Sequence, residues 1–227
     1  MSRLLAALAC AAIAPVASAG EITFTFDDPA AGGEFMGNSG MPGSLTYDTA
    51  AVLDLVVDST DCEDGSINVF QAQLAMELSV GTPSSFAGII SAPVTGSFTF
   101  TDLNSGEVIM TATTTNARLV NFDSAGSVIS SVDGTGTGLS FAAGPALVAI
   151  GLEELMAIDA VFTLTDIDVF QASTIFSDIG GQNPVLNDFD ANAAFTATAT
   201  GQVIPTPGAA ALAGIGLVGF ARRRRRN

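Results

Sequence analysis

The feature that most constrains the fold is a strict alternation of apolar and polar side chains in several short segments. Residues 21–27 place Ile22, Phe24 and Phe26 on one face of an extended chain, with threonines on the other. Residues 96–101 repeat the arrangement with two further phenylalanines. A period of two residues is typical of a half-buried β-strand and does not match the 3.6-residue period of a helix. These segments therefore predict strands that bury one face in a core.

Further segments extend this prediction, separated by turns rich in Gly, Ser, Asn and Asp. Residues 103–106 and 123–126 are typical hairpin turns. Residues 74–78 leave a helical turn open, and residues 146–158 are the stretch where we expect a short helix. Many short strands between polar turns predict an all-β, antiparallel sandwich or jelly-roll-like single domain with a Val, Ile, Leu and Phe core. The other expected strands are residues 52–57, 69–80, 107–115, 118–122, 127–132, 160–165 and 195–202.

Residues 1–19 have the pattern of a secretory signal peptide, with a signal helix. Arg3 provides a short positive region, residues 4–13 form an apolar run, and Ala17 and Ala19 supply the small side chains that signal peptidase reads. We expect cleavage after Ala19, which makes Gly20 the first residue of the exported chain. The apolar run is well short of the ~20 residues of a membrane-spanning helix, which argues against a permanent anchor at this end.

Export leaves the chain with one cysteine, because Cys10 is removed with the signal. The domain that we expect over residues 20–203, called the body below, then has no internal disulfide and depends on its core. A single domain of this length buries enough apolar surface for that. Cys62 is flanked by Asp61 and Glu63, and neighbouring negative charge disfavours a thiolate. We therefore expect a free, unreactive thiol in an acidic loop.

The segment from residue 204 to 227 combines three features in a fixed order: a proline-containing motif, an apolar stretch over residues 208–221, and a basic tail. The prolines hold the backbone extended, which suits the cleft of a processing enzyme. The apolar stretch is marginal for a permanent span, and arginines resist translocation, so the order predicts a stop-transfer sorting signal. The motif is Ile204, Pro205, Thr206, Pro207 and Gly208, and the basic tail is Arg222, Arg223, Arg224, Arg225 and Arg226.

This segment resembles the bacterial PEP-CTERM sorting domain, whose pattern is Val-Pro-Glu-Pro, a short apolar helix and an arginine-rich end. Ile204-Pro205-Thr206-Pro207 stands in place of that motif, with Thr206 where the family has Glu. The resemblance implies transient anchoring in the inner membrane and processing by an exosortase-like transpeptidase, with delivery to the cell surface or extracellular matrix. It covers residues 204–227 and implies nothing about the body. An ordinary membrane anchor stays open, whereas a sortase signal needs Thr where Pro207 stands.

Charge and composition exclude several functions for the body. Its 23 acidic side chains are joined by a single basic one, Arg118, which gives a net charge of −22. Such a body cannot neutralise nucleic-acid phosphates. The body has no His or Lys, so any general acid–base catalysis would depend on its carboxylates. We expect a non-catalytic, structural or adhesive protein whose partner is an extracellular polymer or matrix, and the alternative is a secreted carboxylate-dependent hydrolase.

Two acidic segments are candidate calcium sites, and no other cofactor is predicted. Asp188, Asp190 and Asn192 place oxygen side chains at alternate positions, the spacing that opens a calcium loop. The pattern departs from an EF-hand, because Ala199 stands where the bidentate Glu is needed. Residues 58–64 form the second cluster. A solvated acidic loop is the simpler interpretation of either segment.

Two further patterns have a structural and a functional interpretation. Residues 66–72 and 166–172 share Val-Phe-Gln-Ala after Ile-Asn or Ile-Asp, which indicates either a duplication with two equivalent strands or two strands of similar composition. The segments at Asp48 and Asp123 faintly match an aspartic-protease motif. Asp-Thr and Asp-Ser are also common turn openers, and we expect turns here.

Overall fold

A computed structural model describes residues 19–27, 34–40, 42–86, 89–122, 125–131, 138–177 and 184–203. Within these ranges the chain is a mostly antiparallel β-sheet domain with one short helix, α1 (Pro145–Ala149), so the predicted all-β antiparallel class is confirmed. The helices expected in the signal and in the apolar stretch lie outside the described residues. The strands are β1 (Gly20–Phe26), β2 (Phe35–Asn38), β3 (Gly43–Tyr47), β4 (Leu53–Asp58), β5 (Ile67–Val80), β6 (Ser84–Phe86), β7 (Ile89–Asp102), β8 (Val108–Phe122), β9 (Ala125–Ser131), β10 (Leu139–Ala143), β11 (Leu152–Val169), β12 (Phe176–Ser177), β13 (Val185–Leu186) and β14 (Phe189–Val203).

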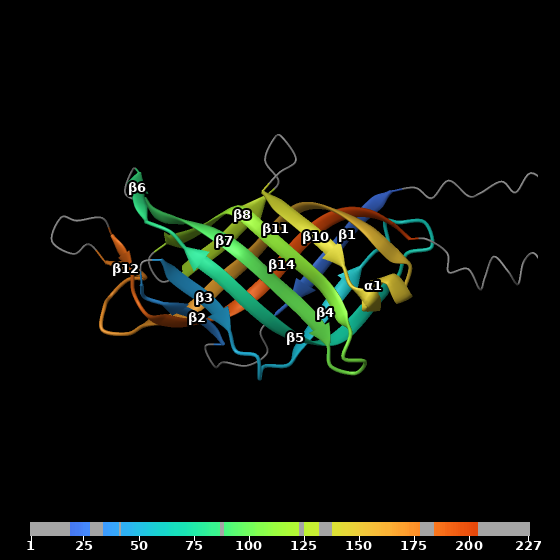
Figure 1. Cartoon of the computed structure of the whole chain (residues 1–227), viewed down its shortest axis with the longest axis horizontal. Coiled ribbons are helices and arrows are strands. Elements are labelled where there is room, and N and C mark those ends of the chain that lie inside the picture. The colour runs from blue at the N-terminus through green and yellow to red at the C-terminus, as the bar shows by residue number, and fades with distance from the viewer. Residues whose placement is uncertain are drawn as a thin grey trace, which may run out of the picture.

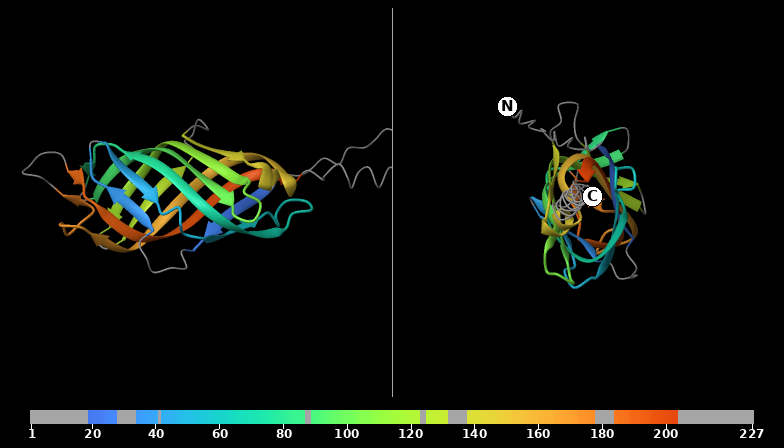
Figure 2. Two further views of the ribbon diagram at one scale, coloured as in Figure 1. Left: turned by 60° about the horizontal axis from the view of Figure 1, so that its bottom comes forward. Right: turned by 90° about the vertical axis from the view of Figure 1, so that its right-hand side faces the viewer.

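The strand pairings close the main sheet on itself (Figure 1). β14 pairs with β11, and the order continues through β9, β8 and β7 to β5. Two strand pairs complete the ring between β5 and β14: β4 with β1 towards one end, and β3 with β2 towards the other. The end-on view in Figure 2 shows this ring. One continuous sheet therefore surrounds the core, and its two halves face each other.

The first and last strands of the body lie side by side. β1 and β14 run antiparallel in unbroken register, from Gly20 opposite Gly201 to Phe26 opposite Phe195. The inward side chains of this pair are apolar and buried, while the outward ones are mostly threonines. The place where the body begins therefore lies beside the place where it ends, as the blue and red strands of Figure 1 show.

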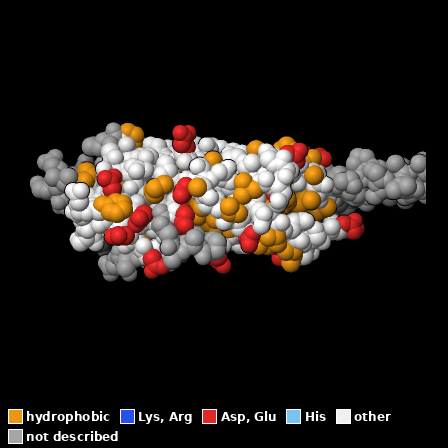
Figure 3. Space-filling view, turned by 90° about the horizontal axis from the view of Figure 1, so that it is seen from below, with side chains coloured by type: hydrophobic (Ala, Val, Ile, Leu, Met, Phe, Trp, Pro, Cys, Tyr) orange, Lys and Arg blue, Asp and Glu red, His pale blue; other side chains and the backbone are white. Residues whose placement is uncertain are grey.

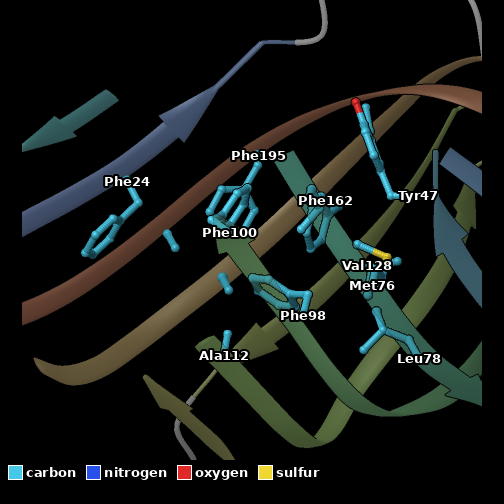
Figure 4. Close-up of a cluster of buried hydrophobic side chains, with 14 of the residues drawn as sticks. Phe24, Tyr47, Met76, Leu78, Phe98, Phe100, Ala112, Val128, Phe162 and Phe195 are labelled. Carbon is cyan, nitrogen blue, oxygen red and sulfur yellow. The ribbon is translucent and has the colours of Figure 1, made fainter. Parts of the chain in front are cut away.

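A cluster of buried phenylalanines fills the closed sheet (Figure 4). The ring centroids of Phe162 and Phe195 are 4.8 Å apart, and those of Phe98 and Phe195 are 5.5 Å apart. Phe98 comes from β7, which is not a neighbour of β14 in the sheet, so this contact crosses the core. Such aromatic pairs contribute about 0.5–1.5 kcal/mol each beyond the burial of their area. The cluster therefore ties the two halves of the sheet together.

Two expectations are corrected within the strands. Residues 107–115 and 118–122, expected as separate strands, form the single strand β8. β8 has a bulge between the residues that pair with Val94 and Gly96 of β7. The strand therefore continues although its apolar–polar alternation is interrupted there. The helical turn left open at residues 74–78 is not formed, because Leu74, Met76 and Leu78 all point into the core at a period of two.

The helix expected over residues 146–158 is much shorter than predicted. α1 ends at Ala149, and Gly151 adopts a φ of 88°, a left-handed conformation that glycine tolerates and that typically ends a helix. Leu152 then begins β11, is buried, and pairs with Val203 at the end of β14. The tertiary pairing therefore overrides the local preference of this apolar segment.

We predict that Phe195→Ala lowers the free energy of unfolding by about 3–5 kcal/mol, because it leaves a cavity at the centre of the cluster. The matched control is Phe170→Ala, since Phe170 is half exposed. Its expected change is within about 0.5 kcal/mol. Urea unfolding followed by circular dichroism measures both. Equal losses in the two variants would show that the cluster does not hold the sheet together.

Candidate functional site

Most residues predicted for processing lie outside the described part of the chain. These are Ala17 of the signal, the motif at residues 204–208 and the arginines at residues 222–226. Their roles stay predictions. The structure does describe the residues next to both predicted processing points, which are Gly20 and Val203.

These two points lie at one end of the closed sheet. Gly20 is opposite Gly201, and Val203 is opposite Leu152 of β11. A Cβ atom on Gly20 would lie only 2.4 Å from the backbone oxygen of Asp61. The loop after β4 therefore packs directly against the first residue of β1, which leaves no room for a side chain there.

Exposed carboxylates from three segments surround this end of the sheet. Glu21 follows Gly20, and Asp61 lies in the loop that packs on Gly20. Glu153 and Glu154 begin β11, where the backbone oxygen of Glu154 would lie 2.8 Å from a Cβ on residue 201. We call these four acidic residues the collar. Figure 3 shows one face of the molecule, on which the described residues present acidic and apolar side chains and no basic one.

The acidic cluster at residues 58–64 is organised by hydrogen bonds of its own. The Asp58 carboxylate accepts from the backbone amide of Thr60 at 3.0 Å and from its hydroxyl at 2.7 Å. These bonds, the amide first, lower the pKa of Asp58. The backbone amide of Cys62 donates to the oxygen of Ser59, and that of Gly65 to the oxygen of Cys62. The loop conformation is thus explained by hydrogen bonding within the loop.

Cys62 is a free thiol, as predicted. It belongs to the acidic loop at residues 58–64, but its side chain is buried. Its Sγ lies 3.7 Å from the backbone oxygen of Gly201. Burial raises the pKa of the thiol, the amide of Gly20 opposes this, and the charge of Asp61 raises it further. Since the thiolate is the reactive form, these surroundings favour an inert side chain.

Two of the three residues predicted for calcium make hydrogen bonds to other groups. The Asp188 carboxylate accepts from the backbone amide of Ser39 at 2.6 Å, which lowers the pKa of Asp188. The amide nitrogen of Asn192 donates to the carboxylate of Asp166 at 3.2 Å. Both residues therefore help to join neighbouring segments of the fold.

The third residue, Asp190 on β14, stands directly opposite Asp168 on β11. Like charges that face each other across two strands are destabilising. Among the described residues, however, no group of three or more His, Cys, Asp or Glu side chains is arranged to hold a metal ion. Calcium binding stays a prediction, without support from the geometry of this pair.

One acidic residue among those described is buried, Asp102 at the turn between β7 and β8. Its carboxylate accepts from the Ser105 hydroxyl at 2.6 Å, from the Ser105 amide at 3.0 Å and from the Asn104 amide at 3.2 Å. The Ser105 hydroxyl is the largest cause of the lowered pKa of Asp102. The group therefore caps a hairpin turn, and it has no second buried acidic residue, among those described, with which to form a catalytic pair.

The turn interpretation of Asp48 is confirmed. Its carboxylate accepts from the backbone amide of Ala50 at 2.9 Å, which is the hydrogen bond of an Asx turn. Asp123, the other residue of the faint protease motif, lies outside the described residues.

The repeat at residues 66–72 and 166–172 does not form two equivalent strands. Ile67 begins β5, whereas Val169 ends β11. The second copy continues into a turn in which Gln171 has a φ of 61°. The duplication interpretation is therefore wrong for the structure, and similar composition explains the likeness.

One surface is missed by the sequence patterns. Met156 and Ile158 on β11 are 73% and 40% exposed, and Val148 on the preceding α1 is also exposed. The sequence favours a helix in this segment, because its apolar run from Leu155 to Ile158 shows no clear alternation. The register with β14 reveals the outward face, since Met156 stands opposite Thr200.

Comparison of the chain with protein-family models, with curated proteins and with solved structures finds no match. In the part of the chain that the structure describes, no helix has the length and apolar character to cross a membrane.

We predict that Ser105→Ala lowers the free energy of unfolding at pH 7 by about 1 kcal/mol, because a hydrogen bond to a charged, buried carboxylate is lost. Since the pKa of Asp102 is lowered in the folded state, its contribution is present above the unfolded pKa of about 3.9 and is lost as the pH falls through the folded value. The difference between variant and native protein should therefore shrink towards pH 2. Urea unfolding across this range measures it, and a difference independent of pH would contradict the assignment.

We also predict that Asp190→Asn raises the free energy of unfolding by about 0.2–1 kcal/mol at low salt, because it removes the repulsion from Asp168. The control is Asp54→Asn on β4, since Asp54 faces Gln71 instead of an acid. The melting temperatures of the native protein and of Asp190→Asn are then compared in excess calcium and in chelator. A calcium-dependent increase in melting temperature that Asp190→Asn abolishes would show that the carboxylate binds the ion and would contradict a purely repulsive role.

Proposed function

We propose that this chain is an exported protein of the cell surface or extracellular matrix, with a structural or adhesive role and no catalytic one. Signal peptidase removes residues 1–19, and the apolar stretch anchors the precursor transiently in the inner membrane. An exosortase-like transpeptidase then cuts at the motif formed by residues 204–208 and transfers the body to its destination.

The observation that carries this proposal is the position of the two predicted cuts relative to the closed sheet. β1 begins at Gly20, directly after the expected signal cleavage, and β14 is described as far as Val203, the last residue before the motif. Removal of both end segments thus takes no residue from a described strand. The start of β1 supports the division between signal and body, because the signal cut was predicted from local sequence patterns alone.

The character of the body supports a non-catalytic role. Most of its described acidic residues are exposed, the buried Asp102 caps a turn, and the core is filled with aromatic and aliphatic side chains. A net charge of −22 keeps such bodies soluble and mutually repelling, so cations are the expected bridges to a matrix polymer. We regard the closed sheet as related to the predicted sandwich or jelly roll, because two halves of one sheet face each other across the core.

The intact mass of the protein recovered from a host with an exosortase tests the proposed processing. We predict a species that begins at Gly20 and ends near Thr206. Thr206→Glu, which supplies the Glu of the family motif, should keep or increase the processed fraction, whereas the double variant Pro205→Ala/Pro207→Ala should leave the arginine tail attached.

Gln202 offers a matched control for the added charge. Gln202→Glu introduces the same carboxylate just before the motif without restoring the family pattern, so it should process like the native chain. Recovery of native protein that retains Arg226 from such a host would contradict the sorting proposal. A native chain that still begins at Met1 would contradict export.

A further inference from the structure

The outer face at the start of β11 carries an apolar patch that no described element covers. It consists of the exposed side chains of Met156 and Ile158, two residues apart on β11; Val148 is also exposed, on helix α1, which contacts β11. Exposed apolar side chains that gather at one end of a molecule are typical of an interaction surface. Because Met156 stands opposite Thr200, the patch lies three residues from the end of the described chain at Val203.

We propose that residues 208–226 of the same chain cover this patch while the precursor is in aqueous solution. In this arrangement the apolar stretch lies on Met156 and Ile158, and the arginine tail lies against the collar. The inference goes beyond the proposed function, since it concerns uncleaved protein whose apolar stretch is not inserted in a membrane.

The length of the chain permits this contact. Val203 is opposite Leu152, and Met156 lies four residues further along β11. At about 3.3 Å per residue, that separation is roughly 13 Å. Residues 204–207 span up to about 14 Å when extended. The sorting motif is therefore long enough to bring Gly208 back over the patch.

The charges around the patch complement the tail. The collar contributes Glu21, Asp61, Glu153 and Glu154 from three segments of the fold. Arg118 is the sole basic residue of the body, and its guanidinium donates to the Ser91 hydroxyl at 3.0 Å on another part of the sheet. The tail arginines are therefore the cations that this chain can offer to the collar.

The covalent connection favours contact within one chain. The tether formed by residues 204–207 has a span of roughly 11 to 14 Å, and short tethers of this kind give effective concentrations in the millimolar range. The charge pairs are exposed, so each is weak and is screened by salt. The tail should thus be docked at low ionic strength and released at high ionic strength.

Limited trypsin digestion of residues 20–227 in detergent-free buffer tests this proposal. Trypsin cuts after Lys and Arg, and this chain offers only Arg118 and the tail arginines. Arg118 lies within β8, paired on both sides by β7 and β9, so it is protected in the folded protein. Loss of the tail arginines, followed by mass spectrometry, therefore reports the accessibility of the tail. We expect cleavage at ~20 mM salt to be about threefold slower than at ~500 mM.

Matched variants separate docking from the effect of salt on the protease. The triple variant Glu21→Gln/Glu153→Gln/Glu154→Gln should lose the slow cleavage at low salt. The control, Asp166→Asn/Asp168→Asn/Asp190→Asn, removes the same charge from acids that lie away from the collar and should keep it. Met156→Ser should also speed cleavage at low salt, because it weakens the apolar contact.

The same salt response in the native chain and in both triple variants would overturn the proposal. Protection that strengthens with protein concentration would also overturn it, because the tail of a second copy would then be the occupant. Protection that is independent of concentration and lost only in the collar and Met156 variants is the result that the proposal requires.

Discussion

The stacking of Phe26 on Phe195 joins the first strand of the body to the last, and the aromatic cluster inside the closed sheet is built around these two rings. The two residues are direct partners in the register of β1 and β14, and their ring centroids are 5.7 Å apart. Phe26 also meets Phe100 and Phe162 edge to face across the core. Cys62 is a free thiol, so among the described residues aromatic packing and strand pairing, and not a disulfide, join the two strands.

This closure links the fold to the proposed route of the protein. Residues 20–26 must pair with residues 195–201, so on the proposed route the sheet cannot close until nearly the whole body has crossed the membrane. Pairing over such a sequence separation makes folding slow and cooperative. The sorting segment follows directly after β14, and its retention in the membrane would hold the body at the surface while closure takes place. The proposed cleavage within the motif then releases a domain whose strands are all in place.

The long strands are predictable from the sequence, because a period of two survives in the segments that bury one face. Phe24, Phe98 and Phe162 all lie, as predicted, in strands with a buried face. Ring closure is not predictable in the same way, since it depends on non-local pairing such as that of Gly20 with Gly201. Local patterns specify which face is buried and leave the choice of partner strand open.

The predictions for single residues divide in the same way, into those that depend on neighbouring residues and those that depend on tertiary contacts. Asp48 opens a turn, as its local pattern predicts, because an Asx turn depends on neighbouring residues alone. The burial of Cys62 comes from the packing of its loop on β1 and β14, which flanking acids cannot reveal. The patch at Met156 is hidden for a related reason, since strand pairing replaces the helix that the segment favours. The alternate oxygen side chains at residues 188–192 suggest a calcium loop in sequence, whereas in the structure two of them bond to other segments.

We infer that residues 20–203 form one cooperative body that needs neither end segment. The free energy of unfolding in urea, compared between residues 20–203 and residues 20–227 at ~500 mM salt where tail contacts are screened, tests it most directly. We expect a single transition in both chains and free energies that agree within about 0.5 kcal/mol. A shorter chain that unfolds in two steps, or that loses several kcal/mol, would contradict it.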